Sequence, residues 1–373
     1  MTPSEFRRDF PIFDDRVYLA SCSQGALSRA VRGAFGEYLA SWDEAGNPWG
    51  RWSEQEERLR ARFAGFINAK PEEVAVTFSA SSALNAIMGS IDYSRRPHVV
   101  TTDLDFPTVG HVLAAQRPRG ARPVFVPPAG GRVPLEALEG HVDGRTAVVA
   151  VGHVSYLTGA RTDLAAVARL AHSHGALLVV DAYQSAGTEP LDVRALGVDV
   201  LVTGALKYLL GPPGVAFLYV REELARSLDP LDTGWLAQED PFAFDIRHLR
   251  PASSARRFQS GTPGVPSVYG ACAALEQVER VGPAAVRRHV LGLAGRLLER
   301  ADERELSVRT PRPEAERGPL VVLEVADADR VASALAAEGI LCSARSGGLR
   351  VAFHYYNTAE DVDRLVDALD RLG

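Results

Sequence analysis

The chain has 373 residues, of which 46% are hydrophobic and 24% charged, and its formal net charge is −6. This length allows one large and one smaller domain, and the composition is ordinary for a globular protein. The charges are interspersed without a basic stripe, which argues against a nucleic-acid partner, and no apolar run of about 18 residues could span a membrane. The N-terminus lacks the apolar core of a signal peptide, and the three cysteines have no metal-type spacing, so we expect a cytoplasmic protein without a metal site.

Seven short apolar runs, separated by turn residues, predict seven strands in the first part of the chain. They span residues 74–78, 98–103, 123–127, 146–154, 176–182, 198–204 and 214–220. Helical patterns at 82–90, 108–116 and 164–173 lie between some of them. Several runs are continuously apolar, as in strands that are covered on both faces. We therefore predict an α/β fold whose large domain, residues 16–255, has three αβα layers and a mostly parallel seven-stranded sheet.

The pattern changes near residue 256. One long helical stretch, 267–301, is followed by strands at 320–325, 339–344 and 349–356 and by helices at 327–338 and 359–372. These elements predict a smaller α+β domain over residues 256–373, against which residues 1–15 are expected to pack. Residues 231–255, rich in Pro, Asp and aromatics, are expected to be the least regular segment.

Lysine is rare in this chain. Only Lys70 and Lys207 are lysines among the 41 basic residues, and the rest are arginines. An amine can lose its proton and add to a carbonyl, whereas a guanidinium does not. A biased genome composition can also make lysine rare throughout a chain. The position of each lysine therefore has to show whether it has a chemical role. Lys70 lies in a polar stretch before a strand, whereas Lys207 lies between two apolar runs and is a candidate Schiff-base residue.

A carboxylate follows the neighbouring predicted strand. Asp181 lies at the C-terminal end of the run 176–182, and Gln184 comes three residues after Asp181. Open α/β sheets bind ligands at the carboxyl ends of their strands, although an Asp there could also cap a turn or helix. An acid and a lysine at one edge suit pyridoxal 5′-phosphate (PLP), which has a cationic ring nitrogen and an aldehyde.

Two further segments could complete a PLP site. Ser81 and Ser82 follow a strand and open a helix, so their hydroxyls and the helix N-terminus could hold a phosphate; a simple N-cap is the alternative. Phe106, in Asp105-Phe-Pro-Thr, could cover the ring, or could simply be a core residue.

These segments, in this order, resemble the class V branch of fold-type I PLP-dependent enzymes, which includes cysteine desulfurases, kynureninase and isopenicillin N epimerase. The most specific segment runs from Asp181-Ala-Tyr-Gln to Lys207-Tyr-Leu-Leu-Gly-Pro-Pro-Gly. The resemblance implies a cofactor bound covalently by Lys207, a pyridine nitrogen paired with Asp181 and a phenolic oxygen bound by Gln184. It further implies phosphate contacts from Ser81 and Ser82 and a ring stacked on Phe106.

The resemblance extends toward the C-terminus. Thr262, in Phe258-Gln-Ser-Gly-Thr, resembles the segment that reaches the phosphate in the neighbouring subunit, which implies a homodimer with shared sites. Arg350 resembles the arginine that grips the substrate α-carboxylate, and a bidentate guanidinium suits that task.

The chain also departs from the family. Leu206 precedes the lysine where desulfurases have His and kynureninase has Tyr, so one phosphate or proton-relay contact is missing or supplied elsewhere. The stretch from Cys342 to Arg350 is too short for the loop that carries the nucleophilic cysteine of desulfurases. Tyr156 replaces a family Asn and is either a general acid or a packing residue. Cys22 borders the expected substrate pocket, either as a thiol or as a small lining residue.

We therefore predict a PLP-dependent C–S lyase that eliminates the β-substituent of a cysteine S-conjugate or sulfoxide. The alternatives are a class V aminotransferase, an amino-acid epimerase, a kynureninase-like hydrolase and a non-catalytic protein of the same fold.

Overall fold

The computed structural model describes residues 1–372, and a seven-stranded sheet forms its centre. The strands, in spatial order, are β2 (Val74–Thr77), β8 (Ala216–Val220), β7 (Val200–Gly204), β6 (Leu177–Asp181), β5 (Thr146–Gly152), β3 (His98–Thr102) and β4 (Arg122–Val126). Neighbouring strands are parallel except around β8, which runs antiparallel to both β2 and β7. The predicted mostly parallel seven-stranded sheet is confirmed.

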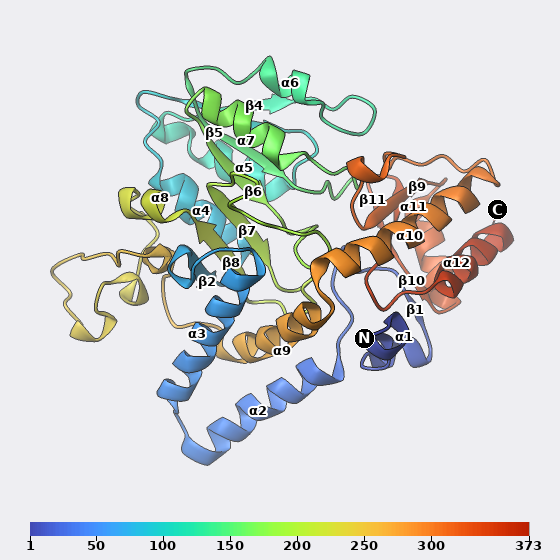
Figure 1. The fold of residues 1–373 in the computed structure, drawn as a ribbon, viewed down its shortest axis with the longest axis horizontal. Helices are drawn as coiled ribbons and strands as arrows, with labels where there is room; N and C mark the ends of the chain where they lie inside the picture. Colours follow the sequence, from blue (N-terminus) through green and yellow to red (C-terminus); the bar gives the residue numbers. More distant parts are fainter. Residues whose placement is uncertain (373) are drawn as a thin grey trace.

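Helices cover both faces of this sheet (Figure 1). One face packs against α4 (Ala80–Ser90), α5 (Pro107–Ala115) and α8 (Glu222–Ser227). The opposite face packs against α3 (Trp49–Phe66), α6 (Leu135–Glu139), α7 (Leu164–Ser173) and α9 (Val265–Val281). Helix α2 (Arg29–Ala45) lies outside them, against α9.

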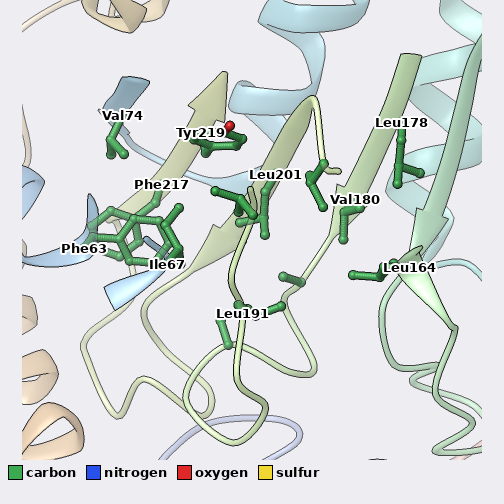
Figure 2. Packing of buried hydrophobic residues seen from close by; sticks show 14 of the residues in the cluster. Phe63, Ile67, Val74, Leu164, Leu178, Val180, Leu191, Leu201, Phe217 and Tyr219 are labelled. Atoms are coloured by element: carbon green, nitrogen blue, oxygen red, sulfur yellow. The ribbon is translucent and has the colours of Figure 1, made fainter. Parts of the chain in front are cut away.

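Side chains along each central strand alternate between the two layers. In β6, Leu178 and Val180 point to the α3/α7 face, whereas Val179 points to the α4 face. Figure 2 shows the α3/α7 layer, where the rings of Phe63 and Phe217 stack with their centroids 3.9 Å apart. Because both faces of the sheet are buried, its strands are continuous apolar runs in the sequence, and the strands could therefore be predicted from it.

The C-terminal part contains an antiparallel sheet in the order β11-β12-β9. Its elements are β9 (Leu320–Glu324), β11 (Ser343–Arg345), β12 (Gly348–Ala352), α10 (Pro283–Asp302), α11 (Ala328–Ala337) and α12 (Ala359–Leu372). The N-terminus joins it: β1 (Val17–Tyr18) pairs with β10 (Ile340–Leu341), and Arg7 of α1 (Pro3–Arg7) forms an ion pair of 2.7 Å with Asp361. The division into two domains at residue 255 stays a prediction.

Two predicted elements are each divided in the structure. The helix expected over 267–301 is broken at Gly282, whose φ of 82° lies outside the helical region and which is followed by Pro283. The strand expected over 339–344 forms two pieces, β10 and β11, which pair with different partners. Both predictions of a single element are wrong.

Residues 231–255 form neither an α-helix nor a β-strand. The segment has short 3-10 helices at Trp235–Ala237 and Pro241–Ala243, and large apolar side chains such as Phe242, Phe244 and Ile246 are exposed. Among the helices of residues 1–372, none combines the length and apolar character needed to cross a membrane.

Candidate active site

The predicted pair Asp181 and Lys207 lies at the carboxyl edge of the sheet. Asp181 is the last residue of β6, in register with Gly152 at the end of β5, and Lys207 follows the end of the adjacent strand β7. Both line one small cavity. The remaining lining residues are Leu104, Asp105, Phe106, Gly152, Val154, Tyr156, Tyr183 and Gln184.

Lys207 has an environment that favours its neutral amine. Its Nζ lies 4.5 Å from the centroid of the Tyr183 ring and 5.6 Å from that of the Phe106 ring. Loss of water lowers the pKa of Lys207, and the attraction of Asp181 opposes this only in part. Among residues 1–372, no carboxylate lies within 4.0 Å of Nζ. The amine is therefore closer to its nucleophilic form than an exposed lysine would be.

Asp181 is a buried carboxylate. Burial raises its pKa to about 6. Two interactions oppose this rise: the Tyr183 N–H donates a hydrogen bond of 2.8 Å to Oδ1, and the positive charge of Lys207 is nearby. The nearby Asp105 contributes to the rise. Such a group readily shares a proton with a basic ring nitrogen placed against it.

Asp105 fixes the turn that carries Phe106. Its Oδ2 accepts from the Thr101 hydroxyl (2.9 Å) and from the Thr102 hydroxyl (2.8 Å) and N–H (2.9 Å), and its Oδ1 accepts from the Gly152 N–H. These bonds tie the end of β3 to the end of β5. Phe106 follows as the N-cap of α5 and thereby lies over Lys207.

The two predicted phosphate serines differ. Ser79 is the N-cap of α4, and the Ser82 hydroxyl turns back to donate 2.8 Å to the Ser79 carbonyl, so it is engaged within the helix start. Ser81 is exposed, and its Oγ lies 3.2 Å from Oγ1 of Thr108, at the start of α5. Ser81 and Thr108 thus offer hydroxyls where the helix dipole favours an anion.

Arg350, on β12 of the C-terminal sheet, contacts Tyr156, one of the residues that line the cavity. It is buried, with 3% exposure, and donates to the Ser343 hydroxyl (3.2 Å), the Ser23 hydroxyl (3.0 Å) and the Tyr156 carbonyl (3.4 Å). The ring of Tyr156 in turn meets Phe106 edge-on, with centroids 5.1 Å apart. Burial raises the pKa of Tyr156, so its hydroxyl is protonated at neutral pH.

Gln184 and Cys22 connect the Lys207 side of the site with the Arg350 side. The Gln184 amide donates 3.0 Å to the Cys22 carbonyl, while its own buried Oε1 has no hydrogen-bond partner among residues 1–372. The buried Cys22 thiol lies 3.6 Å from the Ser343 hydroxyl, which also receives the Arg350 bond. The backbone of Cys22 therefore contacts the site directly, whereas its thiol packs beside the residues that hold Arg350.

Comparison with known proteins identifies the family. The family model described as "Aminotransferase class-V" matches residues 26–365. This chain is a member of the class-V aminotransferase family. It is 39% identical to the protein named "Uncharacterized aminotransferase YcbU" of Bacillus subtilis, over 98% of this chain and 97% of that protein.

Two further proteins resemble this family member along most of its length. A kynureninase of Pseudomonas fluorescens is 31% identical over 90% of this chain and 83% of its own. The apo structure of a cysteine desulfurase from Thermococcus onnurineus NA1 matches with a TM-score of 0.91 and 25% identity, covering 100% of this chain and 98% of that one. The fold and the class V resemblance are both confirmed.

PLP is the cofactor of this class-V enzyme. The residues fit it: Lys207 offers a desolvated amine, Asp181 a buried carboxylate, and Ser81 and Thr108 two hydroxyls at a helix start. The Gln184 side chain also lies at this wall, and its buried Oε1 has no hydrogen-bond partner among residues 1–372. Thr262 is exposed and outside the residues that line the Lys207 cavity, so its role in a neighbouring site stays a prediction.

Besides Thr108, two residues in or near the class-V site were not predicted from the sequence. Tyr183 lies against Lys207, and its place between Asp181 and Gln184 could have indicated this. Arg345, on β11, carries a charge that lowers the pKa of Tyr156, opposing the effect of burial. Among so many arginines, nothing in the sequence distinguishes Arg345.

Proposed function

We propose that this enzyme is a PLP-dependent lyase that eliminates the β-substituent of an amino acid, with cysteine S-conjugates or sulfoxides as its substrates. The turn between β11 and β12 supports this choice over a persulfide-forming desulfurase. Arg345 pairs with Gly348, so only Ser346 and Gly347, with φ of 49° and 73°, connect the strands. Such a tight hairpin has no room for a mobile loop with a nucleophilic cysteine.

The nearest thiol on that side supports the same conclusion. Cys342 lies between β10 and β11, and burial raises the pKa of its thiol to about 12. A thiol with that pKa is almost entirely protonated at neutral pH, and the thiolate is the nucleophile. The sulfur of the substrate therefore leaves as a thiol or sulfenic acid rather than transferring to a protein cysteine.

The residues of the cavity, and Arg350 beside it, have distinct roles in this proposal. Arg350 binds the α-carboxylate with its guanidinium, which Ser343 and Ser23 hold in place. PLP, when bound, would supply an electron sink. Asp181 would hold a proton at the ring nitrogen, and the Lys207 amine would take the α-proton of the substrate. Phe106 and Tyr183 enclose that amine from two sides and limit the access of water.

Tyr156 is the residue that we expect to assist the leaving group. Its carbonyl receives a bond from Arg350, and its ring contacts Phe106, so it bridges the carboxylate side and the cofactor side. A neutral phenol donates a proton from Oη and cannot act as a base. Replacement Tyr156→Phe should slow elimination by about 100-fold for a poorly leaving alkylthiolate. For a well-stabilised arylthiolate the rate should change little, and equal effects on both would argue against an acid role.

Product analysis with a panel of S-substituted cysteines tests the reaction type. Stoichiometric pyruvate, ammonia and thiol support β-elimination. Aminated cofactor with a keto acid that retains the β-substituent would instead support transamination, and loss of α-deuterium without product would support epimerisation. Cleavage of kynurenine would favour the hydrolase. A purified protein that takes up no PLP would favour a non-catalytic role.

We also propose a homodimer with shared sites. Thr262 is not among the residues that line its own Lys207 cavity, and the exposed Phe242, Phe244 and Ile246 offer an apolar surface that a second copy could cover. Mixing the inactive variants Lys207→Ala and Thr262→Arg under subunit exchange should restore activity at one of the two sites. A mixture without any recovery would contradict shared sites.

A further inference from the structure

Few side-chain donors are available on the phosphate side of this site. Leu206, directly before Lys207, has no polar side-chain atom. The Ser82 hydroxyl is also turned inward, onto the Ser79 carbonyl. A doubly charged phosphate needs several donors, so another residue should supply the missing contact.

Tyr183 fills the space above Gly204. A Cβ added at Gly204 would lie 2.3 Å from Cε2, Cζ and Oη of Tyr183. No side chain fits at that distance, and Gly204 is therefore the residue that makes room for this ring and its hydroxyl. The tyrosine hydroxyl consequently occupies the place that a side chain at position 204 would take, three residues before Lys207.

The orientation of Gly204 places this hydroxyl on the side where α4 begins. Val200 and Val202 of β7 pack in the same cluster as Leu84 and Ile87 of α4. Alternate residues of a strand share a face, so a side chain at position 204 would point to the α4 face as well.

The strand register places the Tyr183 hydroxyl at the same edge of the sheet as the start of α4. Gly204 pairs with Ala216, and Ala216 pairs with Thr77, so the ends of β7 and β2 lie in one row. Helix α4 begins at Ala80, just beyond Thr77. The Tyr183 hydroxyl and the N-terminus of α4 therefore share both a face and an edge.

The Tyr183 hydroxyl is free to act as a donor. Among residues 1–372 no hydrogen-bond partner is found for its Oη. Burial and the charge of Asp181 raise its pKa to about 12, so it keeps its proton at neutral pH. The Lys207 Nζ lies 4.5 Å from the ring centroid, so a group attached to that amine is within reach.

We propose that the Tyr183 hydroxyl donates a hydrogen bond to the PLP phosphate at the start of α4, replacing the contact that Leu206 cannot make. This role concerns retention of the cofactor and does not depend on which substrate bond is broken.

The variant Tyr183→Phe removes only the hydroxyl and tests this role in the apoprotein. Binding is measured by absorbance titration with PLP and with 5′-deoxypyridoxal, which lacks the phosphate. The Kd for PLP should rise about 10- to 100-fold, the cost of losing a hydrogen bond to a charged group, while the Kd for 5′-deoxypyridoxal stays unchanged. An unchanged Kd for PLP, or equal losses for both compounds, would overturn the proposal.

Two other variants provide the control and the rescue. Tyr208→Phe removes a buried hydroxyl that has no partner among residues 1–372, directly beside Lys207, and should leave the ratio of the two Kd values unchanged. Tyr183→Ala combined with Gly204→Ser moves a hydroxyl into the vacated space and should bind PLP more tightly, relative to 5′-deoxypyridoxal, than Tyr183→Ala alone. A ratio no better than that of the single variant would count against the proposal.

Discussion

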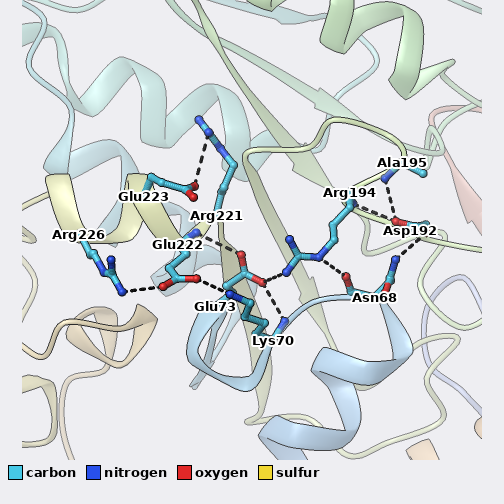
Figure 3. A network of polar contacts seen from close by, with 10 residues as sticks. All are labelled: Asn68, Lys70, Glu73, Asp192, Arg194, Ala195, Arg221, Glu222, Glu223 and Arg226. Atoms are coloured by element: carbon cyan, nitrogen blue, oxygen red, sulfur yellow. Dashed lines mark hydrogen bonds and ion pairs between the residues drawn. The ribbon is translucent and has the colours of Figure 1, made fainter.

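The surroundings of the two lysines differ in every property that decides reactivity. Lys70 precedes β2, at the amino end of the sheet, and its side chain is 58% exposed. Its Nζ donates 2.8 Å to Glu222, within a network that includes Glu73 and Arg194 (Figure 3). The hydrogen bond to Glu222 raises the pKa of Lys70. Lys207 lies at the carboxyl end, close to the rings of Tyr183 and Phe106, and burial lowers its pKa.

This difference shows that reactivity depends on the environment of the amine. A carboxylate in direct contact keeps Lys70 charged, and a charged amine is not nucleophilic. Asp181 influences Lys207 without forming an ion pair within 4.0 Å, so desolvation prevails. Substitutions around the two lysines can separate these effects.

The largest effect is expected for Lys207→Ala. Loss of the base that takes the α-proton should lower kcat by about 10³-fold or more and should remove the absorbance of covalently bound PLP. Steady-state assays and spectra of the purified variant check this. Full turnover in this variant would contradict the mechanism.

Replacement Asp181→Asn should change how the apoprotein responds to pH. The difference between the ordinary pKa of 3.8 and about 6 in the fold corresponds to about 3 kcal/mol at most. Because the folded state binds the proton more tightly, the free energy of unfolding falls as pH rises from about 4 to 6. Asparagine does not titrate, so the variant should gain stability relative to the parent over that range. Urea unfolding at several pH values measures the difference, and a constant difference would refute the assignment.

Arg350→Lys should weaken substrate binding. A lysine keeps the charge but loses the planar, bidentate geometry, so kcat/KM should fall about 10- to 100-fold, mainly through KM. PLP affinity should not change. Arg296→Lys, in a surface ion pair with Asp363, is the matched control and should leave kinetics unaltered. A normal KM in Arg350→Lys would show that the carboxylate binds elsewhere.

The smallest effect is expected for Lys70→Ala. An exposed ion pair contributes little to stability and is screened by salt. The variant should bind PLP and turn over substrate like the parent, with a slight loss of thermal stability that disappears at high salt. Any loss of bound PLP would show that Lys70 also contributes to cofactor binding, which would contradict the contrast between the two lysines.

Much of this site could be predicted from the sequence. Buried parallel strands are continuous apolar runs, so their carboxyl ends, and with them Asp181 and Lys207, could be located. The break at Gly282 was signalled by the following proline but was missed because the apolar pattern continues through it. The contact of Tyr183 with Gly204 could not be predicted, because it depends on the register of two strands and on which face each residue occupies.

Identification of the lysine that carries the cofactor tests the central claim most directly. The PLP-loaded protein is reduced with borohydride, digested and mapped by mass spectrometry, and only two lysines can carry the label. We expect the pyridoxyl group on Lys207 and none on Lys70. Label on Lys70, or PLP retained without modification of Lys207, would contradict the account.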